Sequence, residues 1–172
     1  MEKIKNDPEL APGVSIKICE INDIEALNKA MPSEGFHEAR FKLQQEGKSS
    51  YLVAWQNGTP VGHLDIKWSG SSQPVVKEFI DKTPELSAIS VWPPEKRSQG
   101  IGSMLIAEAE EMVKGRGYDR VGLSVREDNH RARELYEKLG YQDWGQGTYN
   151  DIWQTVSGKQ SDKICSYMVK NL

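Results

Sequence analysis

The sequence Arg97-Ser98-Gln99-Gly100-Ile101-Gly102 lies between a predicted strand and a predicted amphipathic helix. Two glycines one residue apart let the backbone curl and approach a ligand closely. The helix behind them presents unpaired N–H groups and the positive end of its dipole, which favour a bound anion. A diphosphate fits such a turn, and Arg97 adds a charge-assisted contact. A tight turn that binds nothing explains the same residues, so this motif alone leaves both interpretations open.

The residues around Gly102 exclude two other phosphate-binding motifs. A Walker loop requires a lysine and then Ser or Thr after its second glycine, but Ser103 and Met104 follow here. A dinucleotide fingerprint requires a third glycine three positions after the second, and position 105 is leucine. The sequence therefore argues against a nucleotide kinase and against a Rossmann dehydrogenase.

Hydrophobic periodicity on both sides of this turn predicts a mixed α/β domain. Asn57-Gly58 between two apolar runs predicts a β-hairpin. The segment 75–83 is ambiguous, and a polar, glycine-containing connection is expected between 144 and 164. The predicted strands are 14–18, 51–55, 62–68, 85–91, 121–125, 141–144 and 164–169, and the predicted helices are 22–29, 37–46, 101–114 and 132–139.

The composition indicates a single globular domain over residues 1–172. With 22 Lys and Arg against 25 Asp and Glu, the net charge is −3, and no basic stripe of the kind that nucleic-acid binders need is present. No apolar run reaches the roughly 20 residues that cross a bilayer, so no membrane partner is expected. Cys19 and Cys165 lie far apart, which favours a reducing, cytoplasmic location and argues against a metal cofactor.

Further segments fall in register with the glycine turn. Ile89-Ser90-Val91 precedes it, and Val125 to Asn129 and Leu135 to Tyr141 follow it. Together they resemble the GNAT superfamily of acetyl-CoA-dependent N-acetyltransferases, over about residues 85–141. The resemblance implies a GNAT fold of the α/β (α+β) class. Its single mixed, mostly antiparallel sheet of about six or seven strands would splay between 86–91 and 121–125, with about four flanking helices.

The resemblance also implies a site for acetyl-CoA as co-substrate. Pantetheine would lie in the splayed gap against the backbone of Ile89, Ser90 and Val91, and the Val91 N–H would polarise the thioester carbonyl. Asn129 matches a residue that contacts the cofactor, and Tyr136 matches one placed near its sulfur. The residues expected around the diphosphate are Arg97, Ser98, Gln99, Gly100, Ile101, Gly102 and Ser103.

Two of these residues also have purely structural interpretations. Tyr136 could protonate the leaving thiolate of CoA, because a phenol is a competent proton donor at neutral pH. It could equally be a core aromatic on the apolar face that it shares with Ala132 and Leu135. Asn129 could cap the following helix, and both purposes are compatible.

The general base is less evident from the sequence. An alkyl amine is mostly protonated at pH 7, so a proton must leave before the amine attacks the thioester. Some relatives carry a glutamate where this chain has Ser124, which cannot act as a base. Glu85 is the first candidate, directly or through a water molecule. Glu78, Asp65 and His63 are alternatives, and each of them could instead be a solvated surface residue.

The function implied by the resemblance is transfer of acetyl from acetyl-CoA to a primary amine of a small molecule or a protein, by direct attack in a ternary complex. The missing glutamate at Ser124 keeps open an alternative, a catalytically weak CoA-binding module with a sensing or regulatory role. The resemblance also leaves a homodimer open. Five aromatic residues could form a wall for the acceptor or belong to the core: Trp68, Trp92, Trp144, Tyr149 and Trp153.

Overall fold

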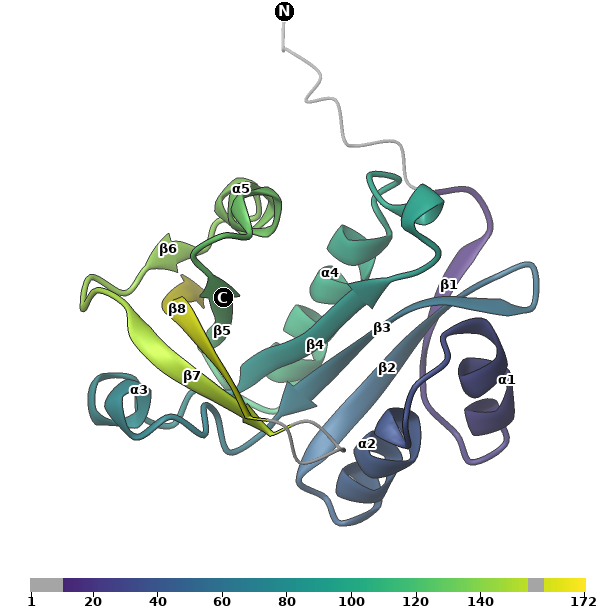
Figure 1. Ribbon diagram of the computed structural model, residues 1–172, viewed down its shortest axis with the longest axis horizontal. Helices are drawn as coiled ribbons and strands as arrows, with labels where there is room; N and C mark the ends of the chain where they lie inside the picture. The colour runs from purple at the N-terminus through teal and green to yellow at the C-terminus, as the bar shows by residue number, and fades with distance from the viewer. Residues whose placement is uncertain (1–10, 155–159) are drawn as a thin grey trace, which may run out of the picture.

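The computed structural model describes residues 11–154 and 160–172, which form a central sheet with helices on both faces (Figure 1). The strands are β1 (Val14–Ile18), β2 (Ser49–Gln56), β3 (Thr59–Lys67), β4 (Glu85–Val91), β5 (Arg120–Arg126), β6 (Gln142–Asp143), β7 (Tyr149–Gln154) and β8 (Gln160–Asn171). The helices are α1 (Asp23–Ala30), α2 (Phe36–Gln45), α3 (Pro74–Phe79), α4 (Ile101–Gly115) and α5 (His130–Lys138), and a 3-10 turn, η1, spans Pro94–Lys96.

The strand order β1-β2-β3-β4-β5-β8-β6, with β7 paired to β8, gives a mixed and mostly antiparallel sheet. The β4–β5 pair is parallel and is joined at only two residue pairs, Glu85–Gly122 and Leu86–Leu123. Beyond these pairs the two strands diverge, as Figure 1 shows. The predicted fold class and the predicted splay between these strands are confirmed.

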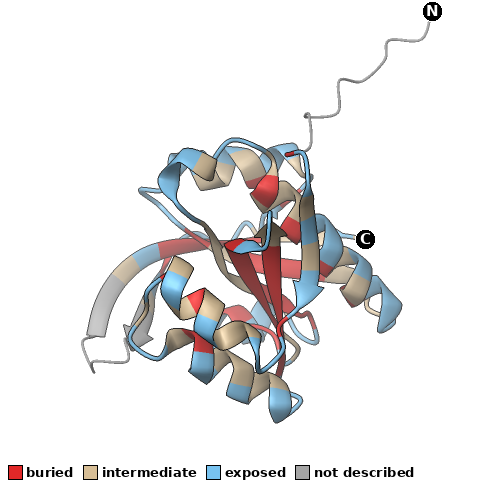
Figure 2. Cartoon of the chain, turned by 90° about the vertical axis from the view of Figure 1, so that its right-hand side faces the viewer, coloured by how far each residue is buried: buried red, intermediate tan, exposed pale blue. Residues whose placement is uncertain are grey.

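Side chains alternate along each strand, so each face of the sheet presents its own set of side chains. Different helices cover the two faces. On β2, Leu52 and Ala54 point into the main core with Ile101 and Leu105 of α4. Tyr51 and Val53 point to the other face and pack with Leu27 of α1. The sheet is therefore buried between α4 on one side and the α1–α2 pair on the other (Figure 2).

The predicted hairpin is present. Asn57 and Gly58 both adopt positive φ, at 51° and 74°, between the antiparallel strands β2 and β3. Positive φ at both central residues suits the two-residue turns that match strand twist, and Asn-Gly tolerates it well. The ambiguous segment after residue 74 begins with α3, where Pro74 occupies the first turn, a position that needs no free N–H.

One strand lies where a polar connection was predicted. β7 runs antiparallel to β8, from the Tyr149–Cys165 pair to the Gln154–Gln160 pair. Tyr149 is buried, whereas Asn150 is exposed and Asp151 half-buried. With so little apolar alternation, the pairing with β8 rather than a local pattern places these residues in the sheet. Among the described residues, no helix is both long and apolar enough to span a membrane.

Candidate active site

A cleft of about 540 Å³ lies where β4 and β5 have separated. Its walls come from the end of β4, the glycine turn, the start of α4 and one face of α5. Every predicted cofactor residue lines it except Gln99, whose side-chain amide instead donates to the Glu95 carbonyl at 3.0 Å. The lining residues are Ile89, Ser90, Val91, Lys96, Arg97, Ser98, Gly100, Ile101, Gly102, Ser103, Asn129, Arg131, Ala132, Glu134, Leu135, Tyr136 and Lys138.

The glycine turn leaves the first backbone N–H groups of α4 without a side-chain cap. Gly100 is the N-cap residue with φ of 82°, a left-handed conformation that glycine adopts without strain. Within the part of the chain that the structure describes, this end of α4 has no side-chain capping hydrogen bond. The N–H groups at this end of the helix are therefore available to an anion in the cleft.

The edge of β4 that faces β5 supplies further backbone donors. Trp92 donates its N–H to the Val61 carbonyl of β3 at 2.9 Å. Because neighbouring residues of a strand direct their N–H groups to opposite edges, the Val91 N–H points to the edge that β5 has left open. The Val91 carbonyl accepts a hydrogen bond from Arg97 Nε at 3.3 Å on the same edge.

A bulge in β4 lies beside this edge. His63 pairs with Ser90 and Asp65 pairs with Ser87, so β4 has one residue more than β3 between these pairs. Ala88, inside the bulge, has φ of 52°, which is strained for a residue with a side chain. The bulge therefore marks the point along β4 where Ala88 and Ile89 line different clefts.

The first cleft carries four cationic side chains against one carboxylate. The cations are Lys96, Arg97, Arg131 and Lys138, and the carboxylate belongs to Glu134. Arg131 donates to the Ser98 hydroxyl, which ties α5 to the glycine turn across the cleft. This excess of positive charge favours a ligand that carries several phosphate charges.

Tyr136 and Asn129 both lie at the cleft, and each also has a structural role. Burial raises the pKa of Tyr136 to about 12, so the phenol stays protonated at neutral pH. Its ring also packs edge-on against Tyr141. Asn129 Oδ1 accepts the Ala132 N–H at 3.2 Å, which makes Asn129 the N-cap of α5.

A second, smaller cleft of about 210 Å³ lies where β4, β5 and β7 meet α2 and the loop before α3. It is lined by Arg40, Lys67, Ser71, Ser72, Gln73, Glu85, Leu86, Ser87, Ala88, Ser124, Tyr149 and Asp151. Because Ala88 lines this cleft and Ile89 lines the first, the two clefts abut at the bulge of β4. A group bound in one can therefore approach a group bound in the other.

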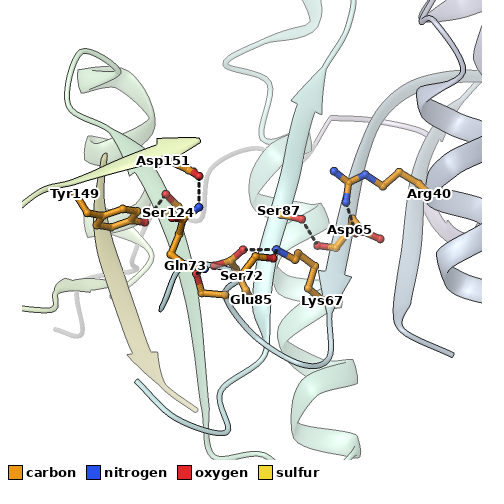
Figure 3. A network of polar contacts seen from close by, with 11 residues as sticks. Arg40, Asp65, Lys67, Ser72, Gln73, Glu85, Ser87, Ser124, Tyr149 and Asp151 are labelled. Carbon is orange, nitrogen blue, oxygen red and sulfur yellow. Dashed lines mark hydrogen bonds and ion pairs between the residues drawn. The ribbon is translucent and has the colours of Figure 1, made fainter. Parts of the chain in front are cut away.

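Glu85 lies in this second cleft, buried and ion-paired (Figure 3). Lys67 Nζ lies 3.2 Å from Glu85 Oε1 and also donates to Ser72 Oγ at 2.9 Å. The Ser124 hydroxyl is 2.7 Å from the Tyr149 hydroxyl. Among the predicted bases, the structure therefore places Glu85 at the wall of the second cleft, close to Ser124.

The three alternative bases lie elsewhere. Glu78 is exposed on α3 and lines neither cleft. Asp65 is fully buried and accepts a hydrogen bond from Arg40 at 2.9 Å, and burial raises the pKa of its carboxyl. His63 is buried against Phe36, and burial lowers its pKa to about 4. The sequence left open that Asp65 and His63 are solvated surface residues. In the structure both are buried, because α2 covers this face of the sheet.

A comparison with known protein families shows to which family this chain, with its two clefts, belongs. Residues 21–141, more than two thirds of the chain, match the acetyltransferase (GNAT) family. The chain belongs to the GNAT acetyltransferase family. The match extends well beyond the region 85–141 that carries the sequence resemblance, and it includes α1, α2 and the hairpin.

Individual N-acetyltransferases are similar to this chain over shorter stretches. An uncharacterized N-acetyltransferase, MJ1207 of Methanocaldococcus jannaschii, is 32% identical over 103 residues, which are 59% of this chain and 42% of that protein. The thialysine N-epsilon-acetyltransferase of Bos taurus is 44% identical over 50 residues, 29% of each chain. The matched part of the chain thus spans less than half the length of these two relatives.

A solved structure has the same fold over almost the whole chain. The putative acetyltransferase YncA of Salmonella typhimurium, solved with its cofactor acetyl-CoA, superposes with a TM-score of 0.66 at 16% identity. The similarity covers 93% of this chain and 94% of that one. At this identity the similarity establishes the GNAT fold alone.

Several cleft residues were not predicted from the sequence. Arg131, Leu135 and Lys138 are spaced i, i+4 and i+7, so one face of α5 presents them together to the cleft. That spacing was a usable signal. Of the five aromatic residues considered for an acceptor wall, Tyr149 lines the second cleft, and Trp144 packs edge-on against it. Trp68 stacks on Tyr118, Trp92 is exposed, and the Trp153 side chain lies outside the described residues.

Proposed function

We propose that this GNAT protein is an acetyl-CoA-dependent N-acetyltransferase that acts on a primary amine by direct attack in a ternary complex. The observation that carries the proposal is the meeting of two unlike clefts at Ala88 and Ile89. One is cationic and lined by free helix and strand N–H groups, and the other is polar and contains a buried carboxylate. A phosphorylated acyl donor suits the first cleft, and an amine suits the second.

The residues of the first cleft fit acetyl-CoA. The N–H groups at the start of α4, together with Arg97, would hold the diphosphate. The open edge of β4 would hold the pantetheine amides from Ile89 to Val91. Acetyl-CoA supplies the reactive thioester. The Val91 N–H, which points to that open edge, would stabilise negative charge on the thioester oxygen, an effect of about 3 kcal/mol in other acyl-transfer sites.

Proton transfer is assigned to residues on both sides of the reacting centre. Glu85, directly or through water, accepts a proton from the ammonium group, and the neutral nitrogen forms a bond to the acetyl carbon. The C–S bond breaks as the amide forms, Tyr136 donates its proton to the leaving thiolate, and the second proton that the nitrogen loses returns through water to the Tyr136 phenolate. The raised pKa of Tyr136 supports this role, because the side chain remains an acid throughout the neutral range.

A second function, a CoA-binding module with little catalysis, is supported by one observation. Ser124 stands where some relatives carry a glutamate, and it is engaged with the Tyr149 hydroxyl. Such a module would bind acetyl-CoA with an increase in thermal stability, and no amine would accelerate release of the thiol.

A thiol-release assay separates these two functions. The protein is incubated with acetyl-CoA and a panel of primary amines, and free CoA is measured with a thiol reagent. The enzyme is expected to release CoA in an amine-dependent manner, with the acetylated amine formed in equal amount. Calorimetric titration of acetyl-CoA, run in parallel, reports binding. Binding without amine-dependent release would favour the sensing module, and absence of both would contradict the proposal.

A further inference from the structure

The second cleft carries charges of both signs, which is unusual for a site that takes only an ammonium group. Arg40 and Lys67 line it together with Glu85 and Asp151. Figure 3 shows Arg40 on one side of the cleft and Ser124, Tyr149 and Asp151 on the other, with Lys67 and Glu85 between them. A cation held near an ammonium group weakens its binding, so the arginine and the lysine need another explanation.

Arg40 is held in place with donors to spare. Its Nη1 donates to Asp65 Oδ2 at 2.9 Å, and the guanidinium carbon lies 5.0 Å from the centre of the Phe36 ring. Asp65 is fully buried, whereas 22% of the Arg40 side chain is exposed. A guanidinium has five N–H donors, and a carboxylate takes two of them side by side. Asp65 and Phe36 therefore orient a guanidinium whose remaining donors are available at the cleft.

Stabilisation of the fold does not by itself explain the Arg40–Asp65 ion pair. Removing a carboxylate from water costs several kcal/mol, and pairs of this kind are often replaced by apolar residues without loss of stability. Burial raises the pKa of Asp65, which is the signature of that cost, and Arg40 opposes the shift. A pair that costs this much and lies at the wall of a cleft is better explained by what the arginine binds.

The carboxylates of the cleft are placed away from Arg40. Glu85 is held by Lys67, and Asp151 accepts a hydrogen bond from Gln73 Nε2 at 2.6 Å on the far side. The cleft therefore has negative charge on the side of β7 and positive charge on the side of α2. The ligand that matches such walls has an ammonium group at one end and an anionic group at the other.

We propose, as an extension that rests on the proposed function, that the acceptor is a free amino acid whose carboxylate is bound by Arg40 while its amine lies toward Glu85. The cleft volume of about 210 Å³ is below the roughly 300 Å³ at which drug-sized ligand pockets begin, which suits a molecule of this size. The polar lining from Ser71 to Gln73 also suits a small hydrophilic ligand.

Matched acceptor pairs test the carboxylate directly. Thiol release is measured with L-lysine, L-ornithine, L-alanine and glycine, each against the amine that lacks the carboxylate: cadaverine, putrescine, ethylamine and methylamine. At least one amino acid is expected to exceed its partner in kcat/KM by about tenfold or more, as for loss of a charge-assisted bidentate contact. L-Lysine amide, which keeps the shape without the charge, should behave like cadaverine if lysine is the substrate.

Two substitutions locate the effect at Arg40. Arg40→Gln should raise KM for the amino acid by about tenfold or more and leave the decarboxylated amine unchanged. Because this variant leaves Asp65 buried without a cation, Arg40→Lys serves beside it: it keeps the ion pair and loses the planar fork, and the same selective rise in KM is expected. Lys42→Gln, on the exposed face of the same helix, is the matched control and should change neither acceptor.

The outcomes separate this inference from the function on which it rests. If decarboxylated amines or protein amines are acetylated as well as or better than every amino acid, the inference is overturned and the enzyme activity stands. An equal effect of Arg40→Lys on both members of a pair would also overturn it. If no amine at all releases CoA while acetyl-CoA still binds, the proposed function itself fails.

Discussion

The burial of His63 is expected to make the fold sensitive to mild acid. The ring lies on β3 and packs against the rings of Phe36, His37 and Tyr51. Its pKa is lowered from 6.5 to about 4, chiefly by burial and secondly by His37, and the nearby Ala88 carbonyl acts weakly in the opposite direction. In the unfolded chain the same ring would return to its ordinary pKa.

The sign and size of the effect follow from these two values. Between pH 6.5 and pH 4 the unfolded chain binds a proton that the folded protein does not, so the free energy of unfolding falls as the pH is lowered through this window. The values differ by about 2.5, and at 1.36 kcal/mol for each pH unit the whole window is worth about 3 kcal/mol. Between pH 7 and pH 5 the loss is about 2 kcal/mol.

Urea unfolding at pH 7 and pH 5 measures this loss. His63→Phe keeps the ring and removes the titration, so wild type should lose about 2 kcal/mol more than the variant between the two pH values. His130→Gln, at the exposed histidine that begins α5, is the control and should follow wild type. Parallel losses in wild type and His63→Phe would show that another group carries the acid sensitivity, and would contradict the role given to His63.

Three further substitutions test the site and its frame. Tyr136→Phe should lower kcat by about a hundredfold or more and leave the calorimetric affinity for CoA unchanged, whereas an equal loss of both would mean that the ring is structural. Glu85→Gln should lower kcat and leave the calorimetric affinity for CoA unchanged, because it removes the carboxylate that accepts the ammonium proton; an unchanged kcat would exclude Glu85 as the base. Gly122→Ala should lower the free energy of unfolding by about 1–3 kcal/mol in urea titrations, because the added Cβ would lie 2.5 Å from the Tyr167 ring; full stability would show that the ring moves freely.

The sequence was sufficient for the elements that are determined locally. Asn57-Gly58 predicted the hairpin, and the glycine turn before Ile101 predicted the start of α4, because both need backbone conformations that few residues adopt. The family resemblance predicted that β4, which precedes this turn, and β5, which follows α4, splay apart. Local periodicity alone would not have placed β5 beside β4.

The sequence was insufficient wherever a distant element decides the environment. The alternation along β3 indicated that His63 and Asp65 share a face, but it could not show that α2 covers that face and buries both. β7 was missed because its residues alternate poorly and owe their strand conformation to β8. Arg40 was not considered as a site residue, since only the tertiary fold brings α2 to the cleft beside Glu85.

The central claim is that the backbone at the start of α4 holds the diphosphate of acetyl-CoA, with the thioester directed toward the junction of the two clefts. A crystal structure of the protein with bound CoA tests it most directly. We expect the diphosphate within hydrogen-bond distance of the N–H groups of Ile101, Gly102 and Ser103, and the pantetheine along the open edge of β4. Diphosphate bound elsewhere on the protein, with side chains filling the space between β4 and α5, would contradict it.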